Sequence, residues 1–367
     1  MQLKPTVSIV IPSCNGLHHL KNCLPSLVRQ EYQGKWEILV VDNASTDGTA
    51  AYLREQFPQI RVVANKINEG FAKANNQAAS VAQGEYLALI NNDMRAREDW
   101  LASLVDTCQK SGAVCVGGMI LDWEGQNIDF AGAQLHCFGV AQQQGIEMSV
   151  QQLDGYAKMR PISFACGGNL LIRRDVFLEI GGFDEDYFAY AEDVDLGWRL
   201  WLCGYPVFLS PTAFTFHRRH SGSAFLDHSD RLYYNARNML YTMYKNYSEE
   251  NLNRFMSVGL LIKMQLGCNN VWKNGGAGGL AFENYFEIRA VRDFLLNIPL
   301  MRPKRQWIQS RRVWGDSMVL QYVDTSINPH FREMLHRDLD DMLEAGEQVG
   351  RMARERRRGD APQNGTE

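Results

Sequence analysis

The chain has 367 residues, of which 45% are hydrophobic and 22% are charged, an ordinary composition for a globular protein with a large core. Its formal net charge of -4 argues against a general nucleic-acid binder, because phosphate contacts require a basic surface. Eight cysteines occur without a CxxC pair or a Cys/His cluster at zinc spacing, which argues against a disulfide framework and a structural zinc site and favours a reducing cytosol.

The hydrophobic segments predict no membrane-spanning helix. The N-terminal stretch MQLKPTVSIVIPSCNG lacks the long apolar core and the cleavage site of a signal peptide, so we interpret it as a first strand. The segment nearest to a membrane span, VGLLIKMQLG, is short and contains Lys263. We therefore expect a cytoplasmic protein whose contact with a membrane, if it has one, is peripheral.

In the first third of the chain, short apolar runs alternate with amphipathic segments. The apolar runs predict strands, and the amphipathic segments predict helices. This alternation predicts a parallel sheet with right-handed crossover connections. The expected strands are 7–11, 37–41, 60–63 and 86–90, and the expected helices are 17–30, 46–57, 71–82 and 98–110.

The rest of the chain is patterned less regularly. Residues 117–161 are rich in Gly and Gln, and they predict a mixed region of hairpins and loops. Long helical stretches follow Asp227, and the basic and polar tail is expected to be disordered. Between these regions we expect a strand with a Gly-Gly kink at 162–174, helices at 174–183 and 192–204 that end near Gly181 and Gly204, and a pair of strands at 205–219.

Polar residues follow three of the expected strands where each one ends. The apolar run Leu87–Ile90 is followed at once by Asn91, Asn92 and Asp93, the first strand ends in IPSCNG, and the second ends in VVDNASTDGT. Because the carboxyl ends of parallel strands meet at one edge of a sheet, these residues predict a polar ligand crevice. The chain has neither a GxGxxG dinucleotide fingerprint after its first strand nor a GxxxxGK[ST] phosphate loop, which argues against a dehydrogenase and a P-loop nucleotide triphosphatase.

Six segments occur in the order seen in family 2 inverting glycosyltransferases: VSIVIPSCNG, EILVVDNASTDGT, NEGFAKANNQA, LALINND, GGFDEDYFAYAEDVDLGWRL and FTFHRR. The resemblance spans residues 7–220 and is closest to the branch that contains bacterial rhamnosyltransferases of cell-surface polysaccharide assembly. It implies the GT-A fold, an α/β fold with a Rossmann-like, mostly parallel central sheet flanked by helices. The implied organisation is a catalytic domain at 1–227, a helical C-terminal extension at 228–345 and the tail at 346–367.

Asp42 ends the second expected strand. The resemblance implies that its carboxylate accepts a hydrogen bond from the ring of uracil or thymine, a contact that discriminates well because its loss leaves a buried charge unpaired. From the residues alone, Asp42 could equally stabilise a tight turn or cap the helix that begins near Thr46. In the family context we expect a pyrimidine nucleotide.

Asp93 stands where the family's metal-binding DXD motif ends. A carboxylate suits Mg²⁺ or Mn²⁺ beside a diphosphate, so the resemblance implies a divalent metal cofactor held partly by Asp93. Asn91 replaces the first aspartate of the motif, which removes one negative charge from the implied site. Asn92 is a candidate for hydrogen bonds to ribose or sugar hydroxyls. The alternative for all three residues is a polar exit from the strand.

Three carboxylates, Glu192, Asp193 and Asp195, open the expected helix at 192–204. Asp193 aligns with the second acid of the family's ED pair, which implies a general base that takes the acceptor hydroxyl proton during an inverting, in-line displacement. Glu192 is assigned to hydrogen bonding with the acceptor or to holding the loop, and compensation of the helix dipole is the simpler interpretation of Asp195. A retaining glycoside hydrolase needs two carboxylates on opposite sides of one bond, which adjacent residues do not easily provide.

His217 lies in FTFHRR, where several GT-A enzymes have a histidine that contacts the metal or the diphosphate. A structural or exposed histidine is the alternative. Arg218 and Arg219 could neutralise phosphate oxygens of the leaving nucleoside diphosphate, or they could be solvated surface charges.

Further residues are expected to line the same crevice. Gly168 and its neighbour Asn169 are assigned to the pocket for the donor sugar or the acceptor, because glycines in a strand allow close backbone approach. Ordinary helix and bulge positions are the alternatives. The remaining residues that the resemblance assigns to the nucleotide sugar are Pro12, Asn15, Asn43, Gly70, Lys73 and Asn76.

The C-terminal segments ENLNRFMSVGLLIKMQLG and RAVRDFLLNIPLMRPKRQWIQSRRVW combine apolar residues with Arg, Lys and Trp. This composition suits interfacial helices near anionic lipid headgroups, on the inner face of the cytoplasmic membrane. Packing of these helices on the catalytic domain, or formation of a homo-oligomer, is the alternative.

Together these features predict transfer of a sugar from a pyrimidine nucleotide diphosphate sugar to a hydroxyl of a glycan or polyprenyl-linked acceptor in cell-surface polysaccharide synthesis. dTDP-rhamnose is a candidate donor, and a UDP-hexose or UDP-N-acetylhexosamine is the alternative, because Asp42 does not separate uracil from thymine. A sugar nucleotidyltransferase would need a Gly-rich, basic loop after the first strand, and PSCNG is neither. An inactive sugar-nucleotide- or lipid-binding subunit is the remaining alternative, against which the presence of Asp93 and Asp193 argues.

Overall fold

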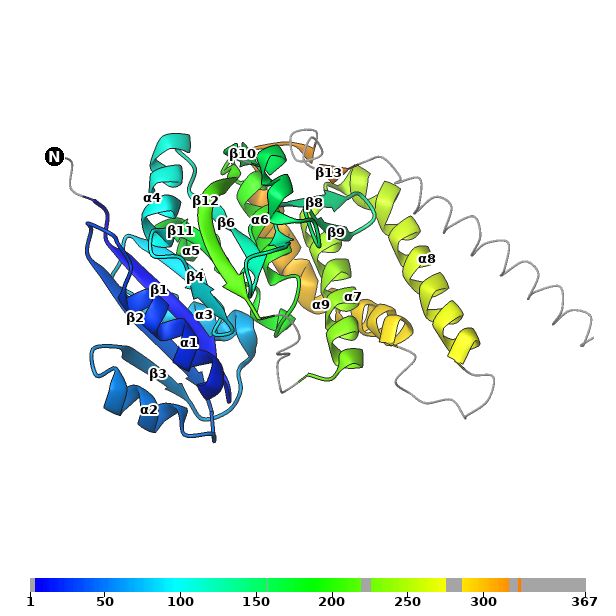
Figure 1. Cartoon of the computed structure of the whole chain (residues 1–367). Helices are drawn as coiled ribbons and strands as arrows, with labels where there is room; N and C mark the ends of the chain where they lie inside the picture. The colour runs from blue at the N-terminus through cyan, green and yellow to red at the C-terminus, as the bar shows by residue number, and fades with distance from the viewer. Residues whose placement is uncertain (1–3, 157, 219–225, 275–285, 317–322, 325–367) are drawn as a thin grey trace, which may run out of the picture.

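The computed structural model describes residues 4–156, 158–218, 226–274, 286–316 and 323–324, and Arg219 and the predicted tail lie outside them. Its central sheet has the strand order β10-β12-β6-β11-β4-β1-β2-β3, with β5 paired to β12 and β7 paired to β6 (Figure 1). These strands are β1 (Val7–Ser13), β2 (Trp36–Asn43), β3 (Arg61–Asn65), β4 (Tyr86–Ile90), β5 (Met94–Ala96), β6 (Cys115–Asp122), β7 (Ile128–Phe130), β10 (Arg160–Pro161), β11 (Asn169–Arg173) and β12 (Val207–His217). A small second sheet contains β8 (Ala133–His136), β9 (Val140–Gln143) and β13 (Val323–Asp324).

The N-terminal half of the sheet is parallel, as the alternation of apolar runs and amphipathic segments predicts. Strands β3, β2, β1 and β4 all run in one direction, and they are connected by α1 (Leu17–Val28), α2 (Thr49–Gln56) and α3 (Gly70–Val81). Side chains on both faces of β1 are buried, including Ile9 and Val10, which explains why the strand is a continuous apolar run. The register places Ser13 beside Asp42, so the polar ends of β1 and β2 adjoin.

The C-terminal half of the sheet corrects three predictions. The expected strand pair at 205–219 is wrong, because β12 is one strand whose register with β6 shifts between Leu209 and Phe214 instead of turning back. Residues 117–161 contain the predicted hairpin, β8 with β9, but they also contain most of β6, a strand of the central sheet. The expected strand at 162–174 is shortened to β11, which runs antiparallel to β4 and β6.

Four helices, α6 to α9, follow in the second half of the chain, and α8 and α9 contain most of the two C-terminal segments of mixed apolar and basic residues. Helix α6 (Glu192–Leu202) packs against both β12 and α7 (His228–Asn246). Helices α7, α8 (Glu249–Asn274) and α9 (Phe286–Ser310) lie together on the side of the sheet away from β3 (Figure 1). The remaining elements are α4 (Trp100–Ser111), α5 (Arg174–Glu179) and the 3-10 turns η1 (Val150–Tyr156) and η2 (Glu185–Tyr187).

The long helices begin where the change in sequence pattern predicts. The side chain of Asp227 caps α7 by accepting a hydrogen bond from the Asp230 N–H at 2.7 Å. One hydrophobic core contains residues of β1, α7 and α9, such as Ile9, Tyr241 and Phe294. The C-terminal helices are thus packed on the sheet-bearing part of the chain. Within the described ranges, no helix is both long and apolar enough to cross a membrane.

Candidate active site

The carboxyl ends of β1, β2 and β4 form one rim, tied together by short polar contacts. The amide oxygen of Asn15, after β1, accepts a hydrogen bond from the Thr46 N–H at 2.7 Å. The Asn92 amide, after β4, donates to the Ser13 hydroxyl at 2.9 Å. The three loops that carry the predicted nucleotide-binding residues are therefore assembled side by side, as expected for strands that end at the same edge.

Asp42 and Asn43, at the end of β2, are both buried at this rim. The Oδ1 atom of Asp42 accepts a hydrogen bond from the Ser45 N–H at 3.0 Å, so one of its oxygens stabilises the turn after β2. The Asn43 amide is used inside the protein: it donates to the Gly70 carbonyl at 3.1 Å and accepts from the Asn65 amide at 2.7 Å. Asn43 consequently fastens the start of α3 to the sheet.

The predicted residues on α3 point toward neighbouring loops. Lys73 pairs with Glu69 one turn earlier, at 2.7 Å. The Asn76 amide donates to the Phe183 carbonyl at 2.8 Å and accepts from the Phe183 N–H at 2.9 Å, and it also donates to Glu185 at 3.1 Å. Asn76 therefore holds the loop that leads toward α6.

Asp93 and His217 are brought together, as predicted, and Asp129 joins them. Because β5 pairs antiparallel with β12, Met94 lies opposite His217, and the neighbouring Asp93 Oδ2 lies 3.3 Å from His217 Nε2. On the other side of the ring, His217 Nδ1 lies 2.5 Å from Asp129 Oδ2 on β7. Burial alone would lower the pKa of His217. The hydrogen bonds to Asp129 and Asp93 outweigh this effect and raise the pKa to about 9.

The pair formed by Asp93 and His217 fits a divalent cation by its chemistry. A carboxylate oxygen and an imidazole nitrogen that face each other are donors for such a metal, and a histidine ligand is commonly oriented by a second carboxylate on its other nitrogen, as Asp129 is here. Within the described ranges, no three His, Cys, Asp or Glu side chains converge as a metal-binding cluster. Arg218, which the sequence offers for phosphate, stacks its guanidinium 4.5 Å from the centre of the Trp123 ring.

Glu192 and Asp193 form the first turn of α6, and their environments differ. Asp193 is half-buried, and its two carboxylate oxygens accept hydrogen bonds from the backbone N–H groups of Gly167 at 2.9 Å and Val194 at 2.8 Å. Burial raises the pKa of Asp193 above its ordinary value, and these two hydrogen bonds offset part of that rise. Glu192 is buried, and its Oε2 accepts no hydrogen bond from any described residue.

The pKa values of these two neighbouring carboxyl groups are both raised, and that of Glu192 is raised more strongly. Burial, and after it the charge of Asp193, holds the pKa of Glu192 well above its ordinary range. Of the two carboxyl groups, Glu192 therefore holds a proton more readily than Asp193. A carboxylate that two backbone donors hold in place can act as a general base in its ionised form.

Gly168 and Asn169 join β11 to the strands beside it. A Cβ atom on Gly168 would lie 2.6 Å from the Asn91 amide nitrogen, so a larger residue there would displace the Asn91 side chain. Asn169 is fully buried, and its amide donates to the Met119 carbonyl at 3.1 Å and accepts from the Trp100 indole at 2.7 Å. Asn169 thereby joins β11 to β6 and α4.

Behind the first turn of α6 lies a group of buried ion pairs that the sequence analysis did not find. Asp195 is fully buried and pairs with Arg199 at 2.8 Å and with Lys245 of α7 at 3.0 Å, in addition to its position near the positive end of the helix dipole. Lys245 also pairs with Asp184 at 2.5 Å, and Asp184 pairs with Lys304 of α9.

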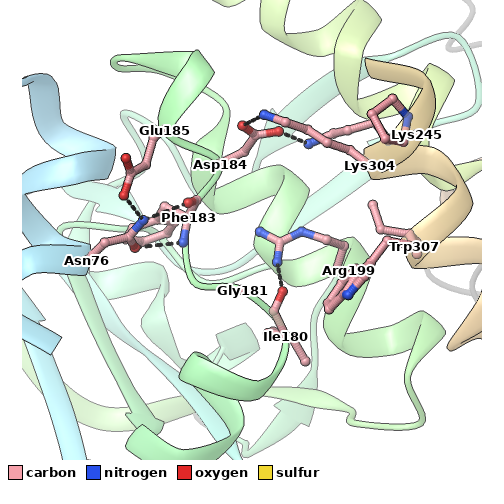
Figure 2. Close-up of a pocket in the computed structure, with 12 residues that line it drawn as sticks. Asn76, Ile180, Gly181, Phe183, Asp184, Glu185, Arg199, Lys245, Lys304 and Trp307 are labelled. Carbon is pink, nitrogen blue, oxygen red and sulfur yellow. Dashed lines mark hydrogen bonds and ion pairs between the residues drawn. The ribbon is translucent and has the colours of Figure 1, made fainter. Parts of the chain in front are cut away.

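Four of these groups, Asp184, Arg199, Lys245 and Lys304, line a cavity of about 440 Å³ between α6, the loop at 180–185 and α9, which Trp307 and Asn76 also line (Figure 2). Arg199 donates to the carbonyls of Ile180 at 2.8 Å and Gly182 at 2.7 Å. The ion pairs therefore fasten α6 to α7 and to the loop that precedes it.

Comparison with known proteins identifies the family. Residues 8–181 match the family model described as glycosyl transferase family 2. The O-antigen biosynthesis protein RfbC of Myxococcus xanthus is 32% identical over 206 residues, which are 53% of this chain and 16% of that protein. The N-acetylglucosaminyl-diphospho-decaprenol L-rhamnosyltransferase of Mycobacterium tuberculosis is 28% identical over 207 residues, which are 50% of this chain and 66% of that protein.

The fold is shared with a solved structure at low sequence identity. GalNAc-T7, in a crystal structure with UDP, GalNAc and Mn²⁺, aligns with a TM-score of 0.55 and 16% identity, covering 82% of this chain and 57% of the other. This similarity confirms the predicted α/β fold of the GT-A type. The chain spans only part of the two curated relatives, 16% of one and 66% of the other. Residues 8–181 of the chain thus match a glycosyl transferase family 2 domain.

Proposed function

We propose that the protein transfers a sugar from a pyrimidine nucleotide diphosphate sugar to a hydroxyl group, with inversion at the anomeric carbon, in cell-surface polysaccharide synthesis. The observation that carries this proposal is the Asp193 carboxylate, which two backbone N–H groups hold in place beside Glu192, a buried carboxyl group of raised pKa. A single ionised base supports one in-line displacement, which inverts the configuration.

Each residue of the site has a role in this reaction. The acceptor hydroxyl loses its proton to Asp193 as its oxygen attacks the anomeric carbon, and the bond from that carbon to the diphosphate oxygen breaks. The raised pKa of Glu192 favours its protonated form, which can donate a hydrogen bond to an acceptor oxygen. Asp42 retains Oδ2 for the pyrimidine ring, because its turn uses Oδ1.

Asp93 and His217 are the residues that would hold a divalent metal. When bound, the metal supplies positive charge to the departing diphosphate. Asp129 would orient His217 by accepting a hydrogen bond from Nδ1, and so present Nε2 to the site. Either Mn²⁺ or Mg²⁺ is compatible with this donor set.

The identity of the donor is inferred from the relatives. The mycobacterial relative is named an L-rhamnosyltransferase, which favours dTDP-rhamnose, whereas GalNAc-T7 was crystallised with UDP, which favours a UDP-hexose or a UDP-N-acetylhexosamine. The name of the same mycobacterial protein, which specifies a diphospho-decaprenol substrate, supports a polyprenyl-linked acceptor.

Helix α9 supports contact of the protein with a membrane surface. Leu295, Leu296 and Leu300 are 51%, 70% and 48% exposed, and Arg292 and Arg302 are exposed on the same helix. Exposed leucines flanked by arginines suit an anionic lipid interface. We therefore propose a catalytic domain at 1–227 and a helical extension that brings it to the inner face of the cytoplasmic membrane.

The proposal is tested by thermal stabilisation with a panel of UDP-, dTDP-, GDP- and CMP-sugars, each with and without Mn²⁺ or Mg²⁺. A ligand that binds only the folded state raises the melting temperature by mass action. We expect stabilisation by a pyrimidine diphosphate sugar, lost in Asp42→Ala and no longer enhanced by metal in Asp93→Ala. Stabilisation by none of these ligands would contradict the proposal and favour a subunit that binds another partner.

A further inference from the structure

The chain immediately before the proposed base adopts an unusual backbone conformation. Phe188, Tyr190 and Ala191 have φ angles of 64°, 71° and 63°, in the left-handed region that residues with a Cβ atom rarely occupy. Each such residue costs free energy and persists only when the surrounding structure enforces it. Ala191 directly precedes Glu192 and Asp193, so the conformation of this segment sets the direction from which both carboxyl groups enter α6.

One side chain on α7 accounts for much of that enforcement. Asn238 is fully buried, and its amide nitrogen donates to the carbonyls of Tyr187 at 3.0 Å, Ala189 at 2.9 Å and Tyr190 at 2.7 Å. Its amide oxygen accepts hydrogen bonds from the guanidinium of Arg237, at 3.0 and 2.8 Å. Both ends of the amide are therefore occupied, and Asn238 makes three contacts within one strained loop.

The opposite side of the loop is held by α3. The carbonyl of Phe188 accepts hydrogen bonds from the N–H groups of Phe71 at 2.7 Å and Ala72 at 3.2 Å, at the start of the helix. The Phe188 ring stacks on Tyr234 of α7, with the ring centres 5.5 Å apart. The segment thus lies between α3, which carries predicted nucleotide-binding residues, and α7, which belongs to the C-terminal helices.

We propose that Asn238 is a positioning residue for Asp193. Its amide holds the segment in which Phe188, Tyr190 and Ala191 have positive φ, and thereby keeps the Asp193 carboxylate on the backbone N–H of Gly167. This inference rests on the proposed function, since it assigns Asn238 a role through the base. Without the amide donors, the carbonyls of Tyr187, Ala189 and Tyr190 each lose the hydrogen bond from Asn238, although Tyr187 still accepts from Arg237 and from the Ala189 N–H. Relaxation of the loop toward ordinary φ angles then rotates the first turn of α6.

The test compares two asparagines of α7 that are equally buried but bond to different groups. Asn238→Asp preserves the shape of the side chain and removes the donors, and Asn238→Ala removes the whole amide. Asn246→Ala is the matched control, because Asn246 is also fully buried but donates to the Asp195 side chain at 3.0 Å instead of the loop backbone. All three variants are expected to have lower melting temperatures than the wild type.

Turnover and hydrogen exchange separate positioning from stability. The probes are dTDP-L-rhamnose and UDP-N-acetylglucosamine with Mn²⁺, whose cleavage is followed by release of dTDP or UDP. For the probe that the wild type cleaves, we expect both Asn238 variants to lose about 10²-fold in kcat with unchanged donor Kd, because a displacement of about 1 Å costs that much. Amide hydrogen exchange of peptides that cover 187–193 should accelerate in both, while Asn246→Ala keeps wild-type kcat and exchange in this segment.

Two results would overturn the inference. In one, Asn238→Asp retains wild-type turnover and protection at 187–193. In the other, Asn246→Ala loses as much kcat as the Asn238 variants, and the loss of kcat in each variant follows the fall in its melting temperature. That result would indicate that the role of Asn238 is purely structural. Asp193→Asn is run in parallel: if it turns over normally, the proposed function fails, whereas exchange at 187–193 still decides whether Asn238 holds the loop.

Discussion

Lys245 is the residue whose replacement should reveal how strongly α6 is fastened to the C-terminal helices. Its side chain is 1% exposed, and its ammonium lies 2.5 Å from Asp184 Oδ2 and 3.0 Å from Asp195 Oδ1, whose side chains are 7% and 0% exposed. Lys245→Met keeps the aliphatic stem but removes the cation that Asp184 and Asp195 share, so that Asp184 keeps only Lys304 and Asp195 keeps only Arg199 as ion-pair partners among the described residues. Removal of one partner from a buried ion pair destabilises by about 3–5 kcal/mol, so we expect a loss in that range.

Equilibrium unfolding in urea measures the loss, and a surface pair provides the control. Lys110 lies 2.6 Å from Asp106 one turn away on α4, but these side chains are 68% and 50% exposed. Lys110→Met should therefore cost no more than about 1 kcal/mol, because water screens an exposed pair. A loss of less than about 1 kcal/mol for Lys245→Met would refute the reasoning that Lys245 compensates both buried carboxylates.

The ion pair between Lys245 and Asp184 predicts a dependence of stability on pH. Burial raises the pKa of Asp184, but Lys245 and Lys304 outweigh it and hold that pKa well below the ordinary value of 3.8. Near pH 3.8 the unfolded chain therefore binds more protons than the native one, and the stabilisation is present above that pH and is lost as the pH falls below it. The difference in unfolding free energy between the wild type and Lys245→Met should be largest at neutral pH and should decrease on acidification.

Three further predictions concern the site and its supports. Glu192→Gln should raise the melting temperature relative to the wild type, by an amount that grows as the pH rises above the ordinary glutamate value of 4.5, because the unfolded chain ionises a carboxyl whose pKa burial holds high in the native state; a difference independent of pH would contradict this. Gly70→Ala should cost more unfolding free energy than Gly112→Ala. Both glycines have positive φ, but a Cβ at Gly70 would lie 2.6 Å from the Phe188 carbonyl oxygen, whereas one at Gly112 meets nothing within 4 Å. Equal losses would be evidence against a close contact at Gly70. Asp129→Asn should weaken Mn²⁺ affinity about 10- to 100-fold in calorimetry with UDP present, because Asp129 orients His217, and unchanged affinity would argue against that role.

The parallel half of the sheet could be predicted because each of its elements is encoded locally. The run at Val7 predicts β1, and the polar residues after Ile90 mark where β4 ends. Strand β6 was missed because Gly117 and Gly118 interrupt its pattern; a Cβ on Gly118 would lie 2.6 Å from the Asn169 amide, so the glycine serves a distant neighbour. Strand β12 was predicted as two strands because Ser210 and Pro211 resemble a turn. The residues before and after them both pair with β6, which keeps β12 one continuous strand.

The candidate site divides in a similar way. Asp93, Asp193 and His217 could be named because motifs carry them. Asp129 lies 88 residues from His217 in the chain, and Asn238 lies 48 to 51 residues from the carbonyls that it binds, so neither pairing leaves a local signal. Residues that hold a site through distant contacts become visible only once the chain is folded.

The most direct test of the account is the turnover of a cleaved nucleotide sugar by Asp193→Asn, measured together with donor affinity. Loss of a general base costs about 10²- to 10⁴-fold in rate, and the substitution leaves the residues proposed to bind the nucleotide in place. We therefore predict that kcat falls by this factor while the donor Kd stays at its wild-type value. Wild-type kcat in Asp193→Asn would contradict the assignment of Asp193 as the base and, with it, the proposed mechanism.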